Sequence, residues 1–248
     1  DPRESGVLVG PLVDAEAFAA MQAALAQARE QGGTLRGGER VMVGGAADAW
    51  YAAPALVTMP AQTAVVCHET FAPILYTLKY KTLDEAIALI TSRPVFVPDL
   101  YLIGDGKTGE SAVIERSPTR AVVRRSHDLL PVANHGVAPE FRNDRENERL
   151  RTELTSGARL SRLEELLARH RGQIDPAMAL SILRDKRGVG DKELGLGNRN
   201  ALDALIATHS VVVDATARVL WVGQGPHALG RYVAFDVRRE LAAGPSPP

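Results

Sequence analysis

The sequence has little cysteine, few aromatic residues and no excess of charge of either sign. Cys67 is its only cysteine among 248 residues, which excludes an internal disulfide framework and a zinc site built on clustered cysteines. A lone thiol is typical of a reducing compartment, so we expect a cytoplasmic protein. The 29 basic and 30 acidic residues give a net charge of -1, so no overall field favours nucleic acid or an anionic membrane as a partner.

Long apolar runs and metal-binding patterns are also missing. No run approaches the ~20 apolar residues that span a bilayer, and the N-terminus lacks the charged-then-apolar pattern of a signal peptide. The six histidines show no i, i+4 pair with an acidic companion, so we expect no metal site. The chain begins at Asp1 without a methionine, which suggests a fragment or a processed product. The sequence leaves the oligomeric state open.

The hydrophobic content of 45% is enough for a real core, and the front of the chain predicts an α/β lobe. Asp14 can cap a helix that runs through Gln31 and ends at Gly32-Gly33. Thr82 and Glu85 form a capping box for a second helix through about Ile90. Between them the pattern predicts strands at Arg40–Val43, Ala55–Met59 and Ile74–Tyr80.

Several motifs in this lobe resemble one enzyme family. They are Val9-Gly-Pro-Leu12, Pro54-Ala-Leu-Val57, Glu69-Thr-Phe-Ala-Pro-Ile-Leu-Tyr76 and Leu83-Asp-Glu-Ala-Ile87. Residues 1–91 resemble a catalytic-domain segment of aldehyde dehydrogenases, in which the Glu of the Glu-x-Phe-x-Pro motif contacts the nicotinamide ribose hydroxyls and the Phe packs near the ring. The resemblance implies that Glu69 and Phe71 bind NAD or NADP. The alternative is a helix-to-strand joint with a surface glutamate and a core phenylalanine.

The rest of the chain predicts strands, then helices, then strands. The first strands are expected at Leu100–Ile103, Ala112–Glu115 and Ala121–Arg124. The helices are expected at Asp144–Leu154, Leu160–Arg171 and Pro176–Leu183. The last strands are expected at Ala204–Val213, Val219–Val222 and Tyr232–Val237.

Two side chains in this part suggest acyl-transfer chemistry. Asn134 ends an extended segment, and Arg159 follows on the next helix. An amide N–H₂ at a strand end can donate to a developing oxyanion, and a nearby guanidinium can stabilise negative charge there. The alternative is that Asn134 caps a turn and Arg159 is a solvated helix charge.

A second resemblance favours the catalytic interpretation. It rests on the order of Gly104-Asp-Gly-Lys-Thr-Gly-Glu110, Ala133-Asn-His135, Gly197-Asn-Arg199 and Pro226-His-Ala-Leu-Gly-Arg231. Residues 93–239 resemble the acyl-coenzyme A:6-aminopenicillanic acid (isopenicillin N) acyltransferase-like N-terminal-nucleophile hydrolases. The resemblance implies an N-terminal cysteine as nucleophile, with Asn134 and Arg159 as catalytic residues. Its substrate would be a small acyl molecule, either a coenzyme A thioester, an acylated amino acid or a peptide.

The chain lacks the catalytic groups that each of these two families uses. The 248 residues contain no Gly-Gln-x-Cys motif and no dinucleotide-binding domain, and Cys67 is internal rather than N-terminal. We therefore expect a junction near Ser92, with a dehydrogenase-like segment at 1–92, an acyltransferase-like segment at 93–243 and a disordered tail at 244–248. The predicted fold is α/β: an incomplete α-β-β-α sandwich of the N-terminal-nucleophile hydrolase type, preceded by the small dehydrogenase-like lobe.

The predicted function is an amide hydrolase or acyltransferase without a cofactor. One alternative is an NAD(P)-dependent aldehyde dehydrogenase fragment. The other is an inert fusion of two truncated enzymes.

Overall fold

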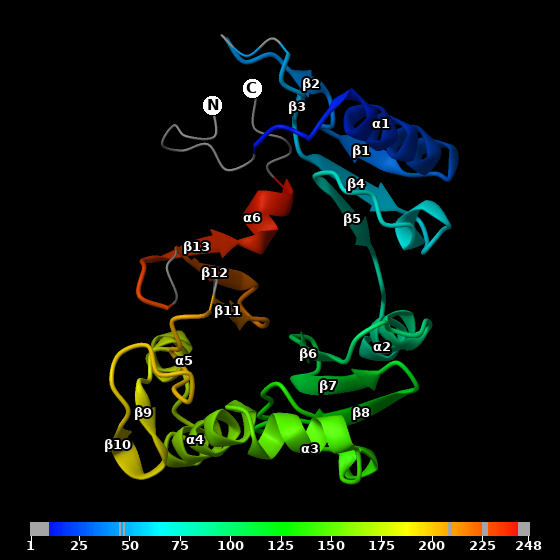
Figure 1. Ribbon diagram of the computed structural model, residues 1–248. Coiled ribbons are helices and arrows are strands. Elements are labelled where there is room, and N and C mark those ends of the chain that lie inside the picture. The colour runs from blue at the N-terminus through cyan, green and yellow to red at the C-terminus, as the bar shows by residue number, and fades with distance from the viewer. Residues whose placement is uncertain (1–9, 45, 47, 208–209, 225–227, 243–248) are drawn as a thin grey trace. The chain divides into compact units, whose positions relative to one another are not determined.

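The computed structural model describes residues 10–44, 46, 48–207, 210–224 and 228–242 (Figure 1). The chain divides into two compact units, Asp1–Leu89 and Ile90–Pro248. Both mix helices with small sheets, which confirms the α/β class at that level. The tail predicted to be disordered, residues 244–248, lies outside the described residues, and the junction predicted near Ser92 stays a prediction. Within the described part of the chain, no helix is long and apolar enough to cross a membrane.

The first unit is a three-stranded sheet beside a long helix. Its elements are α1 (Ala15–Glu30), β1 (Thr34–Arg36), β2 (Arg40–Val41), β3 (Tyr51–Ala52), β4 (Ala55–Met59), the 3₁₀ turn η1 (Val65–Cys67), β5 (Ile74–Leu78) and α2 (Leu83–Thr91). In the main sheet β4 lies between β1, which runs antiparallel to it, and β5, which runs parallel. Strands β2 and β3 form a separate antiparallel pair.

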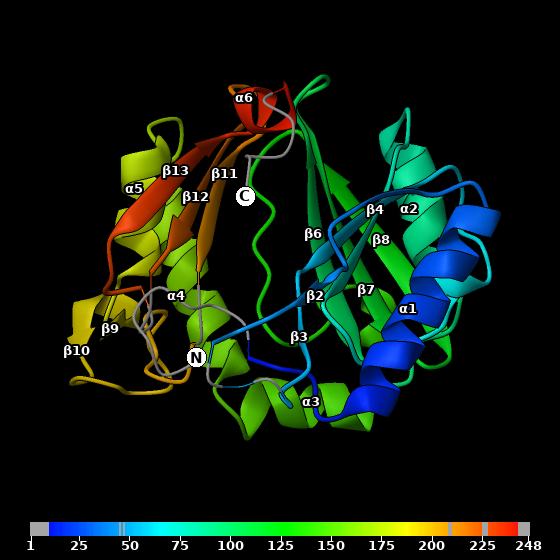
Figure 2. The ribbon, with the colours of Figure 1, turned by 90° about the horizontal axis from the view of Figure 1, so that it is seen from above.

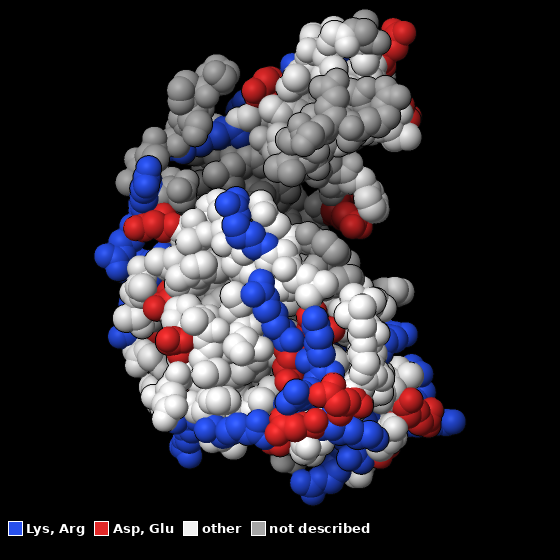
Figure 3. Space-filling view, turned by 90° about the vertical axis from the view of Figure 1, so that its left-hand side faces the viewer, with Lys and Arg blue, Asp and Glu red and all other residues white. Residues whose placement is uncertain are grey.

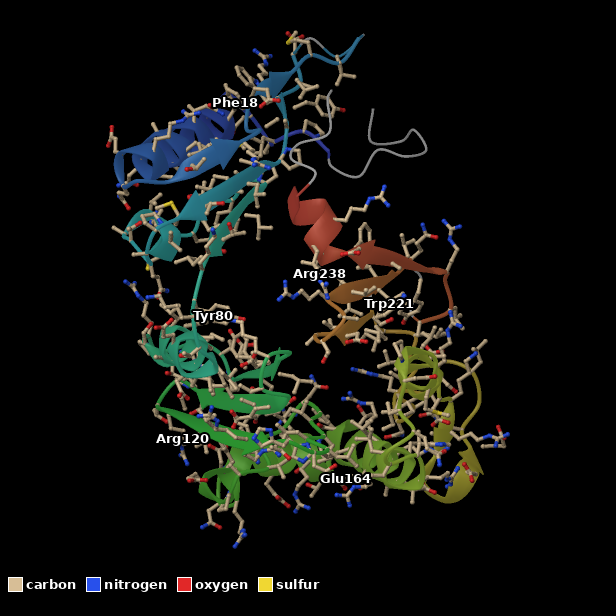
Figure 4. The ribbon with its side chains drawn as sticks, turned by 180° about the vertical axis from the view of Figure 1, so that it is seen from behind. Phe18, Tyr80, Arg120, Glu164, Trp221 and Arg238 are labelled. Atoms are coloured by element: carbon tan, nitrogen blue, oxygen red, sulfur yellow. The ribbon has the colours of Figure 1, made fainter. Side chains whose placement is uncertain are left out.

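Helix α1 begins and ends as its sequence predicts. The Asp14 carboxylate accepts a hydrogen bond of 2.8 Å from the Ala17 backbone N–H, and Gly32 adopts a left-handed φ of +87° just beyond the helix, a conformation that glycine adopts without strain. The buried side of α1, which includes Met21 and Leu25, packs against the buried alternate residues of β4. This contact forms the core of the first unit. Phe18 of α1, labelled in Figure 4, is partly buried and packs against this core.

The second unit contains two three-stranded antiparallel sheets and several helices. Its elements are β6 (Asp99–Asp105), β7 (Glu110–Ser117), β8 (Arg120–Ser126), the 3₁₀ turn η2 (Pro139–Phe141), α3 (Arg145–Thr152), α4 (Ser156–Arg169), α5 (Pro176–Leu183), β9 (Arg187–Gly188), the 3₁₀ turn η3 (Val189–Asp191), β10 (Lys192–Glu193), β11 (Val211–Asp214), β12 (Val219–Gly223), β13 (Tyr232–Asp236) and α6 (Val237–Ala242). Strands β6, β7 and β8 form one sheet, β11, β12 and β13 form another, and β9 pairs with β10. Helix α5 lies beside β11 (Figure 2).

The structure differs from the predictions for this unit in several places. Helix α4 begins at Ser156 rather than at Leu160. The strand predicted from Ala204 begins only at Val211, because the chain turns at Ala204, whose carbonyl accepts from the Ala207 N–H. Val237, predicted to end the last strand, instead begins α6, since the Asp236 carboxylate accepts from backbone N–H groups of that helix. The stacked α-β-β-α sandwich is not confirmed, because the described strands pair into separate small sheets.

A buried arginine connects α4 to the β9–β10 region. Arg162 is 1% exposed, and its guanidinium donates two hydrogen bonds, of 2.9 and 3.0 Å, to the Asp185 carboxylate. It also donates to Glu165 and to Asp191, at 2.9 and 2.8 Å. A buried charge is tolerated when it is fully paired, and this one has three carboxylate partners. Figure 3 shows acidic and basic residues gathered side by side on the lower part of the face in view.

Asp191 is the strained member of this network. Its backbone adopts a φ of +58°, which is unfavourable for most residues other than glycine. The Asp191 carboxylate accepts hydrogen bonds from Arg169 and from Arg162. Because both partners favour the charged form, they lower the pKa of Asp191 from 3.8 to about 2. The ion pairs therefore hold the η3 turn in its unusual conformation.

This depressed pKa predicts how stability depends on pH. The unfolded chain binds the proton more tightly than the folded one, so the stabilisation by Asp191 is fully present above about pH 4 and disappears as the pH falls through about 2. We expect Asp191→Asn to be less stable than the wild type at pH 5, and the difference to shrink toward pH 2. Urea denaturation at several pH values measures it.

The control for this experiment is Glu193→Gln, which removes the exposed Arg187–Glu193 ion pair of 3.0 Å. Exposed pairs contribute roughly 0 to 1 kcal/mol, so this variant should follow the wild-type curve. A stability difference between Asp191→Asn and the wild type that is the same at pH 5 and pH 2 would contradict the prediction.

Candidate functional site

The predicted cofactor residues lie on the connection between η1 and β5. Glu69 and Phe71 are both exposed, and the phenylalanine ring is 85% accessible. The alternative of a core phenylalanine at this position is therefore wrong. The turn is tight on either side of Phe71, since the Ala72 N–H donates to the Thr70 carbonyl at 2.7 Å and the Ile74 N–H donates to the Ala72 carbonyl at 2.8 Å. This backbone holds the ring outward.

Both residues line one cavity with helix α1. Its volume is about 780 Å³, and alanines of α1 form much of its wall. The Gln31 side chain fixes η1 to the end of α1 by accepting the Val65 N–H at 3.3 Å. A carboxylate and an open aromatic face thus lie beside a smooth apolar wall. Such a set can accept hydrogen bonds from hydroxyl groups and cover a flat ring.

The cysteine near this cavity is followed directly by a histidine. Cys67 is half-buried in η1, and His68 follows it as an exposed residue. No hydrogen bond joins the two side chains in the described structure.

The structure brings Asn134 and Arg159 together. The Arg159 guanidinium donates a hydrogen bond of 2.7 Å to the Asn134 side-chain oxygen. Burial lowers the pKa of Arg159, and the nearby positive charge of Arg199 lowers it further. Asn134 does not end a strand as predicted, because β8 ends at Ser126 and Asn134 lies in the irregular connection to α3. The contact fixes the orientation of the Asn134 amide.

The segment from Asn134 to Ala138 is held by three side chains that the sequence analysis missed. Ser156 accepts the Asn134 N–H at 2.8 Å. Asn147 accepts the Gly136 N–H at 2.6 Å and donates to the Gly136 carbonyl at 2.9 Å. Glu115 accepts the next two N–H groups, from Val137 and Ala138, each at 2.9 Å. We call residues 134–138 the clamped segment. These four N–H groups have acceptors within the protein, so they do not form an oxyanion hole.

Glu115 is the central acceptor of this arrangement. Its side chain is fully buried, and its second oxygen receives the Arg124 guanidinium at 2.5 Å. The position of Gly136 is equally restricted, because a Cβ there would approach the Phe141 ring to 2.8 Å and the Glu115 carboxylate to 3.0 Å. One sequence signal was available: Glu115 is a charged residue within the apolar strand run that begins at Ala112.

His135 lies within the clamped segment as a buried side chain. It is 4% exposed, and Ser156 is 2% exposed. The two side chains are joined by a hydrogen bond of 2.7 Å between His135 Nδ1 and Ser156 Oγ. Burial lowers the pKa of His135, and the positive charge of Arg151 acts in the same direction. Both effects favour the neutral form of the imidazole.

The role of Glu115 predicts that the substitution Glu115→Gln strongly destabilises the fold. Glu115→Gln replaces one oxygen with an N–H₂ group, so either Arg124 or the two backbone N–H groups lose their acceptor. Breaking a buried charge pair in this way costs about 3 to 5 kcal/mol. We expect a loss of that order in the free energy of unfolding, measured by urea denaturation.

Glu110→Gln is the matched control on the same strand, because it removes the more exposed Arg125–Glu110 pair and should cost about 1 kcal/mol or less. Equal losses in the two variants would refute the assignment.

Comparison with known proteins finds relatives for the front of the chain. Residues 1–94 match the model of the aldehyde dehydrogenase family. Aldehyde dehydrogenase family 7 member A1 from Brassica napus is 35% identical over 94 residues, and that from Pisum sativum is 38% identical over 94 residues; each match covers 38% of this chain and 18% of the relative. Alpha-aminoadipic semialdehyde dehydrogenase from Bos taurus is 39% identical over 89 residues, which cover 36% of this chain and 16% of the relative.

These matches correct the predicted function. The chain spans at most 18% of the length of these three relatives, and the matches support dehydrogenase rather than acyl-transfer chemistry. The prediction of an amide hydrolase or acyltransferase is therefore wrong, and no finding supports the resemblance of residues 93–239 to the N-terminal-nucleophile hydrolases. The alternative prediction, an aldehyde dehydrogenase lineage, is the one supported. Residues 1–94 are similar to a segment of the aldehyde dehydrogenase family.

Proposed function

We propose that residues 1–94 supply the nicotinamide-facing part of an NAD(P)-dependent aldehyde dehydrogenase. The observation that carries the proposal is the placement of Glu69 and Phe71 on one cavity, with both side chains exposed. In this role Glu69 accepts hydrogen bonds from the two hydroxyls of the nicotinamide ribose, and Phe71 lies near the nicotinamide ring. NAD(P), when bound, supplies the hydride acceptor for aldehyde oxidation.

The residues present fit this group chemically. An ionised carboxylate has two oxygens and several lone pairs, so it can accept two hydroxyl donors together. The exposed ring of Phe71 offers an apolar face that can exclude water from the nicotinamide. The alanines of α1 leave room beside both side chains. The protein's part is therefore to hold the ribose and to shield the ring.

For the substrate, the proposal extends only to its chemical class. One relative is named for alpha-aminoadipic semialdehyde. We extend only the class, an aldehyde, to this chain, because the matched segment covers 16% of that relative.

A chimera tests the proposed role of Glu69. Residues 1–94 would replace the matching segment of the Pisum sativum relative, and NAD-dependent oxidation of an aldehyde would be followed. We expect an active chimera in which Glu69→Gln raises the KM for NAD by roughly 10- to 100-fold, since hydrogen bonds to a charged group contribute ~1.5–3 kcal/mol. Glu16→Gln, an exposed change on α1 outside the cavity, is the control and should leave the KM unchanged. A folded, active chimera whose KM is insensitive to Glu69→Gln would exclude the proposed contact.

For the 248-residue chain itself we expect negligible NAD binding. The Gly104-Asp-Gly-Lys-Thr-Gly109 run has the spacing of a dinucleotide-binding turn, but it joins the antiparallel strands β6 and β7 and no helix follows it. Glu69 and Phe71 therefore provide only a small part of the surface that such a ligand needs. Titration calorimetry with NAD should give no saturable heat. A saturable signal at micromolar cofactor would show that other residues complete the site.

A further inference from the structure

A second cavity lies entirely in the part of the chain that the family match leaves out. Its volume is about 550 Å³, and all its lining residues lie between Pro98 and Leu150. Apolar side chains of β6 and of the connection to α3, including Leu100, Leu102 and Phe141, form one part of the wall. The clamped segment forms another part. A volume of this size is typical of sites for small molecules.

The hydrogen bonds around His135 fix which of its nitrogens carries the proton. Ser156 Oγ already accepts the Asn134 N–H, and its own hydroxyl hydrogen needs an acceptor because the residue is buried. His135 Nδ1, at 2.7 Å, is the acceptor that the described structure provides. Ser156 therefore donates to Nδ1. With Nδ1 acting as an acceptor, the proton of the ring lies on Nε2.

This Nε2–H group has no acceptor in the described structure. Ser156 occupies the Nδ1 side of the ring and does not line the cavity, whereas His135 does. The remaining ring edge, with Nε2, is therefore the one directed to the cavity. The described side-chain atoms that are both buried and without a partner do not include this Nε2, so water or a ligand can reach it and serve as its hydrogen-bond partner. A ligand with an acceptor atom would supply that partner.

The charges around the cavity restrict what the ligand can be. Its lining includes the carboxylates of Asp99, Glu115, Asp144 and Glu146, and one arginine, Arg116. Arginines outside the lining pair with three of these carboxylates, namely Glu115, Asp144 and Glu146. The carboxylates disfavour an anion. The Nε2–H group of His135 presents a positive hydrogen and disfavours a cation at that point. An uncharged molecule avoids both penalties.

We propose that this cavity binds a small uncharged molecule with an apolar body and a carbonyl-type acceptor, which the His135 Nε2–H group donates to. The apolar body lies against Leu100, Leu102 and Phe141. The site is independent of the dehydrogenase role, because it shares no residue with the segment 1–94. The clamped segment holds His135 in place for this contact.

Cyclohexanone is a suitable probe, with cyclohexylammonium and cyclohexanecarboxylate as charged probes of similar size. The full chain would be labelled with ¹⁵N-histidine and titrated by NMR. We expect the spectrum to show the Nε2–H tautomer of His135, and cyclohexanone to shift this resonance in a saturable, millimolar titration, as expected for so small a molecule. The charged probes should bind at least about tenfold more weakly.

Two substitutions complete the test. His135→Phe keeps a ring in the cavity and removes the donor, so the affinity for cyclohexanone should fall about tenfold. His127→Phe changes an exposed histidine outside the cavity and should leave the affinity for cyclohexanone unchanged.

Four outcomes would overturn the proposal. They are a His135 proton on Nδ1, no saturable shift with cyclohexanone up to its solubility limit, a charged probe that binds as tightly, and a folded His135→Phe variant that keeps full affinity. The first three measurements use the unmodified protein, so they decide the matter even where a variant fails to fold.

Discussion

The second unit depends on one buried carboxylate. Glu115 lies in the middle strand of its sheet, away from water, where an uncompensated charge would be prohibitively costly. Arg124 and two backbone N–H groups of the connection to α3 compensate it. The same bonds attach an otherwise irregular segment to the face of the sheet. The wall of the second cavity, the position of His135 and the approach of Asn134 to α4 all follow from that attachment.

Local features of the sequence predicted local structure well. The starts of α1 and α5 follow from Asp14 and Asp175, whose carboxylates accept N–H groups only three residues ahead. The hairpin of β6 and β7 follows from two apolar runs joined by a short turn. The clamped segment could not be predicted in this way. Its partners lie 11 to 23 residues away in the sequence, as Asn147 does from Gly136 and Glu115 from Ala138. Nothing in these residue types indicates which of them will pair.

The two candidate sites show when residue chemistry identifies function. Asn134 and Arg159 lie in contact, yet an amide and a guanidinium bond to each other equally well as a structural link. Their chemistry was compatible with acyl transfer without requiring it, and scattered short motifs did not decide the question. Glu69 and Phe71 lie in a continuous stretch of family-like sequence, and the family match supports that stretch; the cofactor role of the two residues stays a proposal. Continuity over many residues carried more information than the chemistry of any pair.

At position 191, the backbone conformation and the side-chain contacts favour different amino acids. The left-handed backbone there favours glycine, as at the preceding residue, Gly190, whereas the two arginines beside it require a carboxylate. Glycine would relax the main chain but leave the buried guanidinium of Arg162 with one partner fewer. A longer acid such as glutamate would keep the charge but would fit this backbone less well than aspartate. Few amino acids can therefore replace Asp191 during sequence drift, although its carboxylate lies near the surface and takes part in neither candidate site.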